Sequence, residues 1–540
     1  MLIPVDFAGN SDGSAMRVAF ALLTTVVLGL DIAGLVGTGE ALAQAGRPRA
    51  AQSREARAGT VFIHGATVYD QNHLWAYVWS HAAGSGNAGD IDFVARTMEQ
   101  LYREHGYFLA RVEARRDSRT GSVEYQVREG RISRIEIEGF PANVAARIEA
   151  YFSAALSEGP AQLAAFERAV ALSGDLSGVS VRTELTDLDE SGGAGLKVIG
   201  AAVRQRGSLT VDNPPRRLGK SASAFLSQEF YSTFVGGDML RFGLAGNKVF
   251  RHDSISRYGG VHYRTPIGSL GSYFEAFAGT SLARRDLSGT LQDSTQRGRN
   301  AIVVFGYPLL RDLHQFLFLL GEYDYSRGRS VSGFGSAVSQ AQTLRASLVY
   351  GLVRDDGGTI KTGMTISAGH GKEDRLPGLR PISPNFWHLR AGFGWVQPFD
   401  HIMPGLALRT EVIGQATSSR VPEVEKFHLG DRERMRGYGF AEFEGGTGVT
   451  GTFELTKYIP TGLETITGVT PYVFFDTGYI HDRSLIAGKN DHLLSSLGAG
   501  MRLFVGSHVA VNGWLAMPLN RDSANRRPSP AGYLRVSAFW

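Results

Sequence analysis

The chain has 540 residues, which is too long for one compact core and predicts at least two folding units. Its formal net charge is only +4, with acidic and basic residues interspersed, so it lacks the basic footprint of a nucleic-acid-binding protein. It contains no cysteine, which excludes thiol catalysis, iron–sulfur clusters and cysteine-based zinc sites.

The first segment, residues 1–43, has the pattern of an export signal. A basic start at Met16 precedes a short apolar run, and small residues at Ala41-Leu42-Ala43 offer a cleavage site. A membrane anchor is the alternative, but the run is short for a spanning helix. We therefore expect a signal peptide that starts at Met1 or Met16, followed by a polar linker at 44–59.

Residues 60–205 carry the same order of predicted elements twice: a strand, two helices and two strands. In the first copy, strands are expected at 60–68, 107–115 and 122–128, and helices at 70–83 and 90–105. In the second copy, strands are expected at 132–137, 179–185 and 195–201, and helices at 144–156 and 161–172. The repeat predicts two small α+β domains, at 60–130 and 131–205.

Residues 206–540 form a series of short segments in which apolar residues alternate with polar or small ones. Leu344 and Leu348, for example, alternate with Arg345 and Ser347. The segments number about 16, and an even number of strands is typical of a closed barrel in an outer membrane. A soluble β-protein would also alternate, but it would not need this many strands. We predict a transmembrane antiparallel β-barrel that ends on an aromatic residue, Trp540.

A loop of about 30 residues, 418–447, interrupts the barrel pattern, and loops of this length are usually functional. The second strand after it places Phe474, Asp476 and Gly478 on one face. An aspartate facing lipid would cost about 2–4 kcal/mol at worst, so Asp476 is expected to face the lumen. Such a carboxylate needs a cation, and Arg436 on an inward-folding loop is the candidate.

The alternative interpretation is a surface loop with a solvated Arg436. Asp476 would then pair with another lumenal base, such as Arg502. Whichever holds, the remaining charges of the run 431–436 are expected to be solvated. No residue pattern indicates an enzyme, since the 14 histidines are scattered and no nucleophile or acid pair stands out. We expect no catalytic residue, cofactor or metal site.

Several of these segments resemble known motifs when taken together. The stretch YREHGYFLARVEARRDSRTGSVEYQVREGRISRIEIEGF resembles POTRA domains, the polypeptide-transport-associated repeats. Arg436-Gly437-Tyr438 resembles the (V/I)RG(Y/F) signature of the barrel-assembly and two-partner secretion superfamily, and Phe474-x-Asp476-x-Gly478 resembles its FxDxG motif. Further positions resemble the TpsB transporters of the FhaC/ShlB/HecB group: Asp212, Asn213, Gly237, Asp238 and Glu454. Trp540 stands where most members of the family have phenylalanine.

The resemblance implies an outer-membrane transporter, haemolysin secretion/activation protein-like, whose POTRA domains lie in the periplasm. Its expected partners are a secreted client (an adhesin, haemolysin or toxin), membrane lipids and the barrel-assembly machinery, with no nucleic acid and no cofactor, and it is expected to be a monomer. The resemblance also implies that Arg436 pairs with Asp476, that Gly437 allows a tight turn, and that Tyr438 packs on the inner wall. A barrel insertase, or a passive porin or adhesin, stays open as an alternative.

One departure from the resemblance concerns the sealing of the pore. Family members carry an N-terminal helix that plugs the barrel, but only the segment 44–59 lies between the predicted cleavage site and the first predicted strand. A plug helix and its tether need more chain than that. We therefore predict no plug helix, and the inward loop becomes the candidate for closing the pore.

Overall fold

The computed structural model describes residues 61–82, 90–153, 159–186, 189, 192–213, 221–249, 255–285, 294–332, 335–374, 381–483 and 490–540. The predicted signal peptide, the linker and the predicted absence of a plug helix lie outside these residues. The chain divides into two compact units, one with the two repeats and one with the barrel. In the described part of the chain, no helix combines the length and apolar character needed to cross a membrane.

The first repeat is a three-stranded sheet with two helices packed on it. Both helices contribute apolar side chains to the buried core of the repeat. These are Leu74 of the first helix and Met98, Leu101 and Tyr102 of the second. Asp90 caps the second helix by accepting hydrogen bonds from two backbone N–H groups of its first turn. The strand order is β1-β3-β2, for these elements: β1 (Val61–His64), α2 (Gln71–Ala82), α3 (Ile91–Glu104), β2 (Arg111–Arg116) and β3 (Val123–Arg128).

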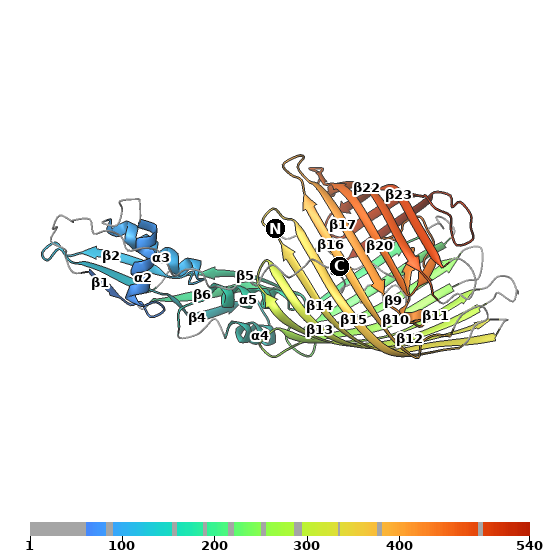
Figure 1. Cartoon of the computed structure of the whole chain (residues 1–540), viewed down its shortest axis with the longest axis horizontal. Coiled ribbons are helices and arrows are strands. Elements are labelled where there is room, and N and C mark those ends of the chain that lie inside the picture. The colour runs from blue at the N-terminus through green and yellow to red at the C-terminus, as the bar shows by residue number, and fades with distance from the viewer. Residues whose placement is uncertain are drawn as a thin grey trace, which may run out of the picture. The chain divides into compact units, whose positions relative to one another are not determined.

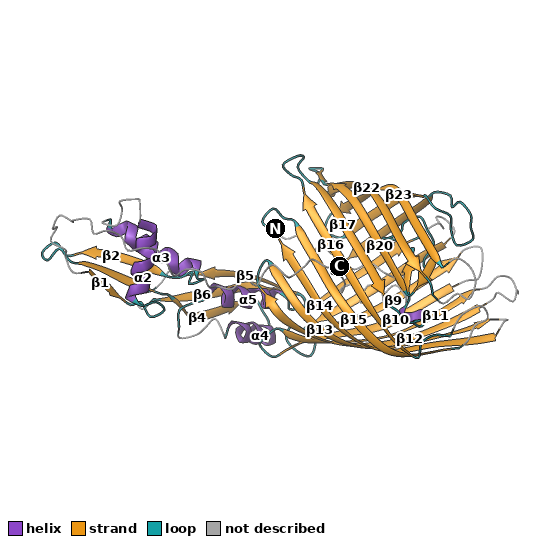
Figure 2. Cartoon of the chain, in the orientation of Figure 1, coloured by secondary structure: helices purple, strands orange, loops and turns teal. Residues whose placement is uncertain are grey.

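The second repeat has the same order of elements, as predicted, and the strand order β4-β6-β5. Its elements are β4 (Arg131–Glu138), α4 (Ala142–Phe152), α5 (Leu163–Gly174), β5 (Val179–Leu185) and β6 (Gly193–Ala202). In both repeats a parallel pair, β1 with β3 and β4 with β6, is completed by an antiparallel edge strand. Figure 2 shows that the long helices gather in these repeats, whereas the rest of the chain is built from strands.

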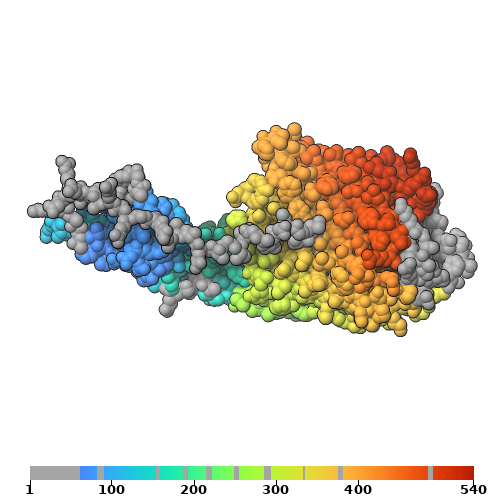
Figure 3. Space-filling view, in the orientation of Figure 1, coloured from blue at the N-terminus to red at the C-terminus, as the bar shows by residue number. Residues whose placement is uncertain are grey.

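A closed antiparallel barrel follows, which confirms the predicted fold class. Because β21 continues β20 along the same edge of β22, the strands fill sixteen positions. They run obliquely around the wall (Figure 1), which is continuous on the face seen in Figure 3. The strands are β7 (Gln205–Asp212), β8 (Ser221–Tyr231), β9 (Met239–Val249), β10 (Ile255–Ile267), β11 (Ser272–Arg285), β12 (Ser294–Arg311), β13 (Gln315–Ser332), β14 (Gly335–Val353), β15 (Thr359–Glu373), β16 (Asn385–Pro398), β17 (Leu406–Ala416), β20 (Thr447–Lys457), β21 (Ile459–Pro460), β22 (Ile466–His481), β23 (Asp491–Val505), β24 (Val509–Pro518) and β25 (Ala531–Phe539).

Alternation along the strands separates a lipid-facing surface from the lumen. Leu344 is 65% exposed on the outside, whereas its neighbour Thr343 is 1% exposed and faces inward. The last strand follows the predicted pattern, with Leu534 outside and Tyr533 buried inside. An apolar exterior around a polar interior is the arrangement that a bilayer requires of a barrel.

The seam that closes the barrel joins the first and last strands. β25 pairs with β7 from Arg535 opposite Asp212 to Phe539 opposite Ser208. Trp540 and Gly207 then exchange two backbone hydrogen bonds, of 2.9 and 3.1 Å. A Cβ atom on Gly207 would lie 2.1 Å from the indole ring of Trp540, so only glycine fits beneath the last residue.

Candidate functional site

The segment between β17 and β20 folds into the barrel. It contains a short 3-10 helix (Glu423–Glu425) and a small hairpin, β18 (Phe427–Leu429) with β19 (Phe443–Gly445). Leu429, Met435 and Tyr438 are fully buried, and they pack with Ile480 and Leu494 of the wall strands β22 and β23. We call residues 417–446 the inward loop.

Arg436, near the tip of the inward loop, meets Asp476 on β22. Its Nε and Nη2 atoms donate to the two carboxylate oxygens over 2.9 and 2.8 Å, and its backbone N–H donates to the same carboxylate over 2.9 Å. Nη1 donates to Glu454 on β20 over 2.9 Å. The guanidinium also lies 3.4 Å from the ring centroid of Phe474. Arg436 therefore uses both its bidentate fork and its planar face.

Charge is balanced around this contact. Asp476 is 0% exposed, and Arg436 and Glu454 are each 3% exposed. Arg502, the other base considered for Asp476, donates instead to the second oxygen of Glu454 over 2.6 Å. Two carboxylates thus meet two guanidinium groups, and removing one member would leave a charge buried without its partner. We call this group the Arg436 anchor.

The glycines and the tyrosine of the two motifs let the loop approach the wall. Gly437 has φ +95°, a left-handed conformation that favours glycine. A Cβ atom on Gly478 would lie 2.8 Å from the side chain of Leu429, so the glycine makes room for the loop. Tyr438 donates to the backbone oxygen of Ser495 over 2.8 Å and accepts from the Asn520 N–H over 2.9 Å.

A second contact, which the sequence analysis missed, holds the start of the inward loop. Glu425 accepts from Arg345 over 2.8 and 3.0 Å and from Thr343 over 2.8 Å. Its carboxylate also lies 3.0 Å from the His388 ring nitrogen. Arg345 in turn pairs with Asp324 over 3.0 Å and also with Glu322, so three strands contribute. We call this group the Glu425 anchor. The alternation pattern already placed Arg345 on the face opposite Leu344. A buried arginine needs a carboxylate partner, and this need could have predicted such a contact.

Two more members of the charge run, Arg432 (buried) and Arg434 (half-buried), pair with the wall, which corrects the expectation that they are solvated. Arg432 donates to Asp212 on β7 over 2.9 Å and to Ser223 on β8 over 3.1 Å. Arg434 lies 3.0 Å from Glu411 on β17. The expectation was wrong because the barrel wall surrounds the loop with carboxylates that lie far away in the sequence.

The remaining family-like positions serve two other places. Asn213 lies at the seam, where its side chain replaces a ladder rung by accepting from the Leu534 N–H over 2.7 Å and donating to the Gly532 oxygen over 3.0 Å. Gly237 and Asp238 lie in the turn between β8 and β9, at the opposite rim from the loop. Asp238 there accepts three backbone N–H bonds. These residues belong to the frame of the barrel and not to the loop site.

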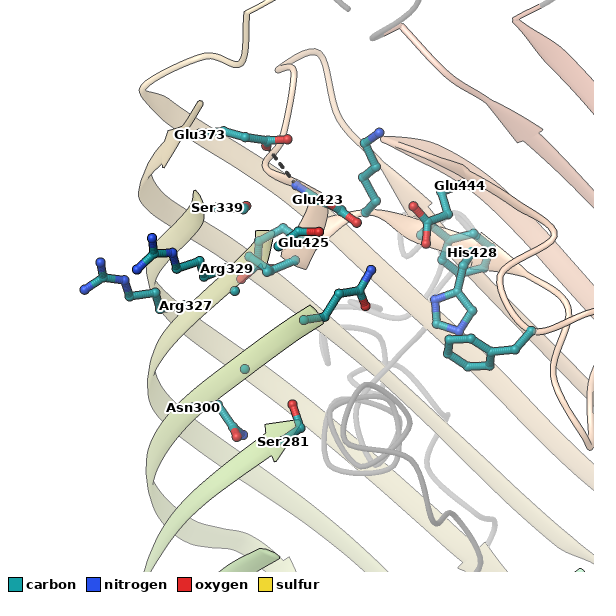
Figure 4. A pocket seen from close by; sticks show the side chains of 18 of the residues that line it. Ser281, Asn300, Arg327, Arg329, Ser339, Glu373, Glu423, Glu425, His428 and Glu444 are labelled. Atoms are coloured by element: carbon teal, nitrogen blue, oxygen red, sulfur yellow. Dashed lines mark hydrogen bonds between the residues drawn. The ribbon is translucent and has the colours of Figure 1, made fainter. Parts of the chain in front are cut away.

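A cavity of about 680 Å³ remains beside the inward loop. Glu423, Glu425, His428 and Glu444 line it from the loop side, and Ser281, Asn300 and Ser339 line it from the wall strands (Figure 4). Burial and the neighbouring Glu423 carboxylate raise the pKa of Glu444 to about 7. Within the described ranges, no group of three or more histidine or carboxylate side chains is placed to hold a metal ion.

Comparisons with known proteins agree with this architecture. The family described as haemolysin secretion/activation protein ShlB/FhaC/HecB matches residues 200–503. No curated protein matches the sequence. The solved structure of CdiB from Escherichia coli superposes with a TM-score of 0.71 at 16% identity, covering 92% of this chain and 93% of that one. CdiB from Acinetobacter baumannii gives 0.65 at 12% identity, covering 91% of each chain.

The family match spans more than half of the chain and includes the strands and the loop that form the Arg436 anchor. Both solved relatives share the fold over nearly their whole length. The chain therefore belongs to the ShlB/FhaC/HecB family of outer-membrane TpsB transporters.

Proposed function

We propose that this protein moves an unfolded secreted protein from the periplasm through the barrel lumen to the cell surface, and that the inward loop is its gate. The observation that carries the proposal is the Arg436 anchor, which holds an extracellular loop inside the lumen by buried, charge-assisted contacts. A passive porin would also not need the two repeats that precede the barrel.

The chemistry of the anchors suits a gate. Buried ion pairs add little net stability but specify one arrangement, because each charge is costly without its partner. The loop is therefore either fully docked or released, with few intermediate positions. Once water and the polar backbone of a client enter the lumen, the separated charges become solvated and release becomes less costly. Docked, the loop would narrow the pore without any plug helix.

The two repeats supply a place to hold the client. Each sheet has three strands, so β1 and β2 in the first and β4 and β5 in the second are edges. An exposed edge can add an extended segment through main-chain hydrogen bonds with little sequence preference. The client would be an adhesin, haemolysin or toxin that reaches the periplasm unfolded. Its folding outside the cell would give the transport its direction.

The test compares R436A and D476A with wild type in the native host, where the proteins released into the medium are identified by mass spectrometry. We expect secretion into the medium to be lost, while heat-modifiable migration shows that the barrel still inserts and folds. R354A is the matched control, because Arg354 pairs with Asp356 in an exposed turn at the other rim. Normal secretion by both anchor variants would refute the proposed role of the loop.

One observation favours a second candidate, an insertase for other barrels. The β25–β7 ladder pairs five residues and is extended at its ends by the backbone bonds of Trp540 with Gly207 and of Asn213 with Leu534, whereas its neighbours β24–β25 and β7–β8 pair eight residues each. A short seam is what an insertase would open. Depletion of the protein distinguishes the two functions: loss of many outer-membrane proteins indicates an insertase, and loss of one secreted client indicates a transporter.

A further inference from the structure

Eight basic side chains are exposed on the outside of the barrel, near one end of strands β9–β15. They come from five strands that follow one another around the wall and from β15 beyond them. The residues are Lys248, Arg257, Arg284, Arg297, Arg299, Arg327, Arg329 and Lys372. We call this set the basic belt.

Alternation shows that the belt faces away from the lumen. On β12, Ile302 and Val304 are buried, whereas Val303 is 40% exposed on the lipid side. Arg297 and Arg299 share the parity of Val303 and therefore its face. On β13 the buried residues are again the even-numbered ones, and Figure 4 shows Arg327 and Arg329 pointing away from the cavity.

The belt begins where the apolar band ends. Val303 is paired with Tyr323, and Tyr323 with Leu344, so these outward-facing side chains mark one level of the wall. Arg299 follows on the same face four residues from Val303, and Arg327 lies four residues from Tyr323. Short turns such as 268–271 and 354–358 lie at the opposite rim. Because short turns face the periplasm, the belt lies at the level of the outer-leaflet headgroups.

Like charges face each other within the belt. Arg297 is directly opposite Arg329, and Arg299 is directly opposite Arg327. Like charges at opposed positions are destabilising unless an anion lies between them. Among the outward-facing described residues at this rim of β9–β15, the one carboxylate is Asp374, and it already accepts from the Val338 N–H over 2.8 Å. The belt therefore lacks a counter-charge from the described chain.

Another part of the same rim is built differently. At the ends of β22 and β23 the outward-facing charges are His481 and Asp491, which lie 2.9 Å apart as a pair. Trp387 on β16 and Val449 on β20 give that side exposed apolar surface. The ends of β22 and β23 thus carry an opposed pair of unlike charges, whereas β12 and β13 carry opposed cations.

We propose that the basic belt binds the phosphate groups on the headgroups of outer-leaflet lipid. Arginine forks bind phosphate oxygens in a bidentate manner, and a phosphate between each opposed pair would relieve the repulsion. The belt is continuous with the lipid-facing band and points away from the lumen through which a client would pass. A lipid that is anchored in the bilayer reaches this surface directly, so the lipid headgroup and not free phosphate is the ligand.

The experiment uses the purified full-length protein in detergent and counts bound lipid by native mass spectrometry. The probes are diphosphoryl lipid A and its dephosphorylated form, with inorganic phosphate as a competitor. The belt variant is R297Q/R299Q/R327Q/R329Q. The matched control is R115Q/R116Q/R119Q/R182Q, which removes four exposed arginines from the repeats.

Wild type and the control are expected to bind diphosphoryl lipid A at least about tenfold more tightly than the dephosphorylated form, and the belt variant to lose that preference. Inorganic phosphate at the same phosphate concentration should not displace the lipid. Equal binding of both lipids by wild type, or unchanged binding by the belt variant, would overturn the proposal, and so would displacement by free phosphate. If the belt variant fails to fold, the preference of wild type for diphosphoryl lipid A over the dephosphorylated form tests the proposal by itself.

Discussion

The Arg436 anchor and the Glu425 anchor solve the same problem with opposite charges. In the first, the loop supplies the cation and β20 and β22 supply the carboxylates. In the second, the loop supplies the carboxylate and β14 supplies the cation. The loop is therefore held to two parts of the wall by contacts of opposite sign. Because the charges are reversed, adding charge of one sign to the loop cannot strengthen both anchors at once. This property suits the proposed gate, which must also release.

The largest effect is expected from R436A, which breaks the first anchor. It leaves Asp476 buried without a cation, whereas Glu454 keeps Arg502, so docking of the loop should weaken by about 3–5 kcal/mol. We expect a higher mean conductance than wild type in planar bilayers. R354A should conduct as wild type does. Wild-type conductance by R436A would show that the anchor does not hold the loop.

A smaller effect is expected from E425A, which breaks the second anchor. Arg345 keeps Glu322 and Asp324 as partners, so the loss should be about 1–3 kcal/mol. Conductance should rise less than in R436A, and the double variant should exceed both. A larger rise in conductance in E425A than in R436A would contradict this comparison. The buried charge left without a partner would then not determine how much docking is weakened.

R432Q tests whether the contact with the seam is a third anchor. Asp212 keeps hydrogen bonds from Tyr533 and Ser223 after the change, so we expect about 1 kcal/mol or less. Thermal unfolding of the barrel, followed by heat-modifiable migration, should shift by only a few degrees. A change as large as that of R436A would rank this contact with the two anchors.

The smallest effect is expected from pH, through Glu444 beside the Glu425 anchor. Burial raises the pKa of this carboxyl to about 7 when the loop is docked, so docking favours the protonated form. The stabilisation of the docked loop by protonated Glu444 is complete below the ordinary pKa near 4.5, and it is lost as the pH rises through about 7. Conductance should therefore increase modestly between pH 6 and pH 8. E444Q should remove this dependence, and a dependence that persists in E444Q would assign it to another group.

Much of this arrangement could be predicted from local patterns. Alternation placed Asp476 and Arg345 in the lumen, because a strand turns successive side chains to opposite faces. The need of a lumenal carboxylate for a cation made Arg436 a candidate partner, and the motif resemblance implied the same pair. The level of Arg297 and Arg299 at the headgroups came only from the structure, since it depends on the register of neighbouring strands.

By itself the sequence determined the two repeats, the barrel and the face on which each strand residue lies, because these follow from periodicities of a few residues. Only the tertiary structure decided that Glu425 meets Arg345 and that Arg432 meets Asp212, 80 and 220 positions away along the chain. Closure of the barrel brings these residues together. Which side chain across a lumen is nearest depends on strand number, tilt and register, and none of these is encoded in a local pattern.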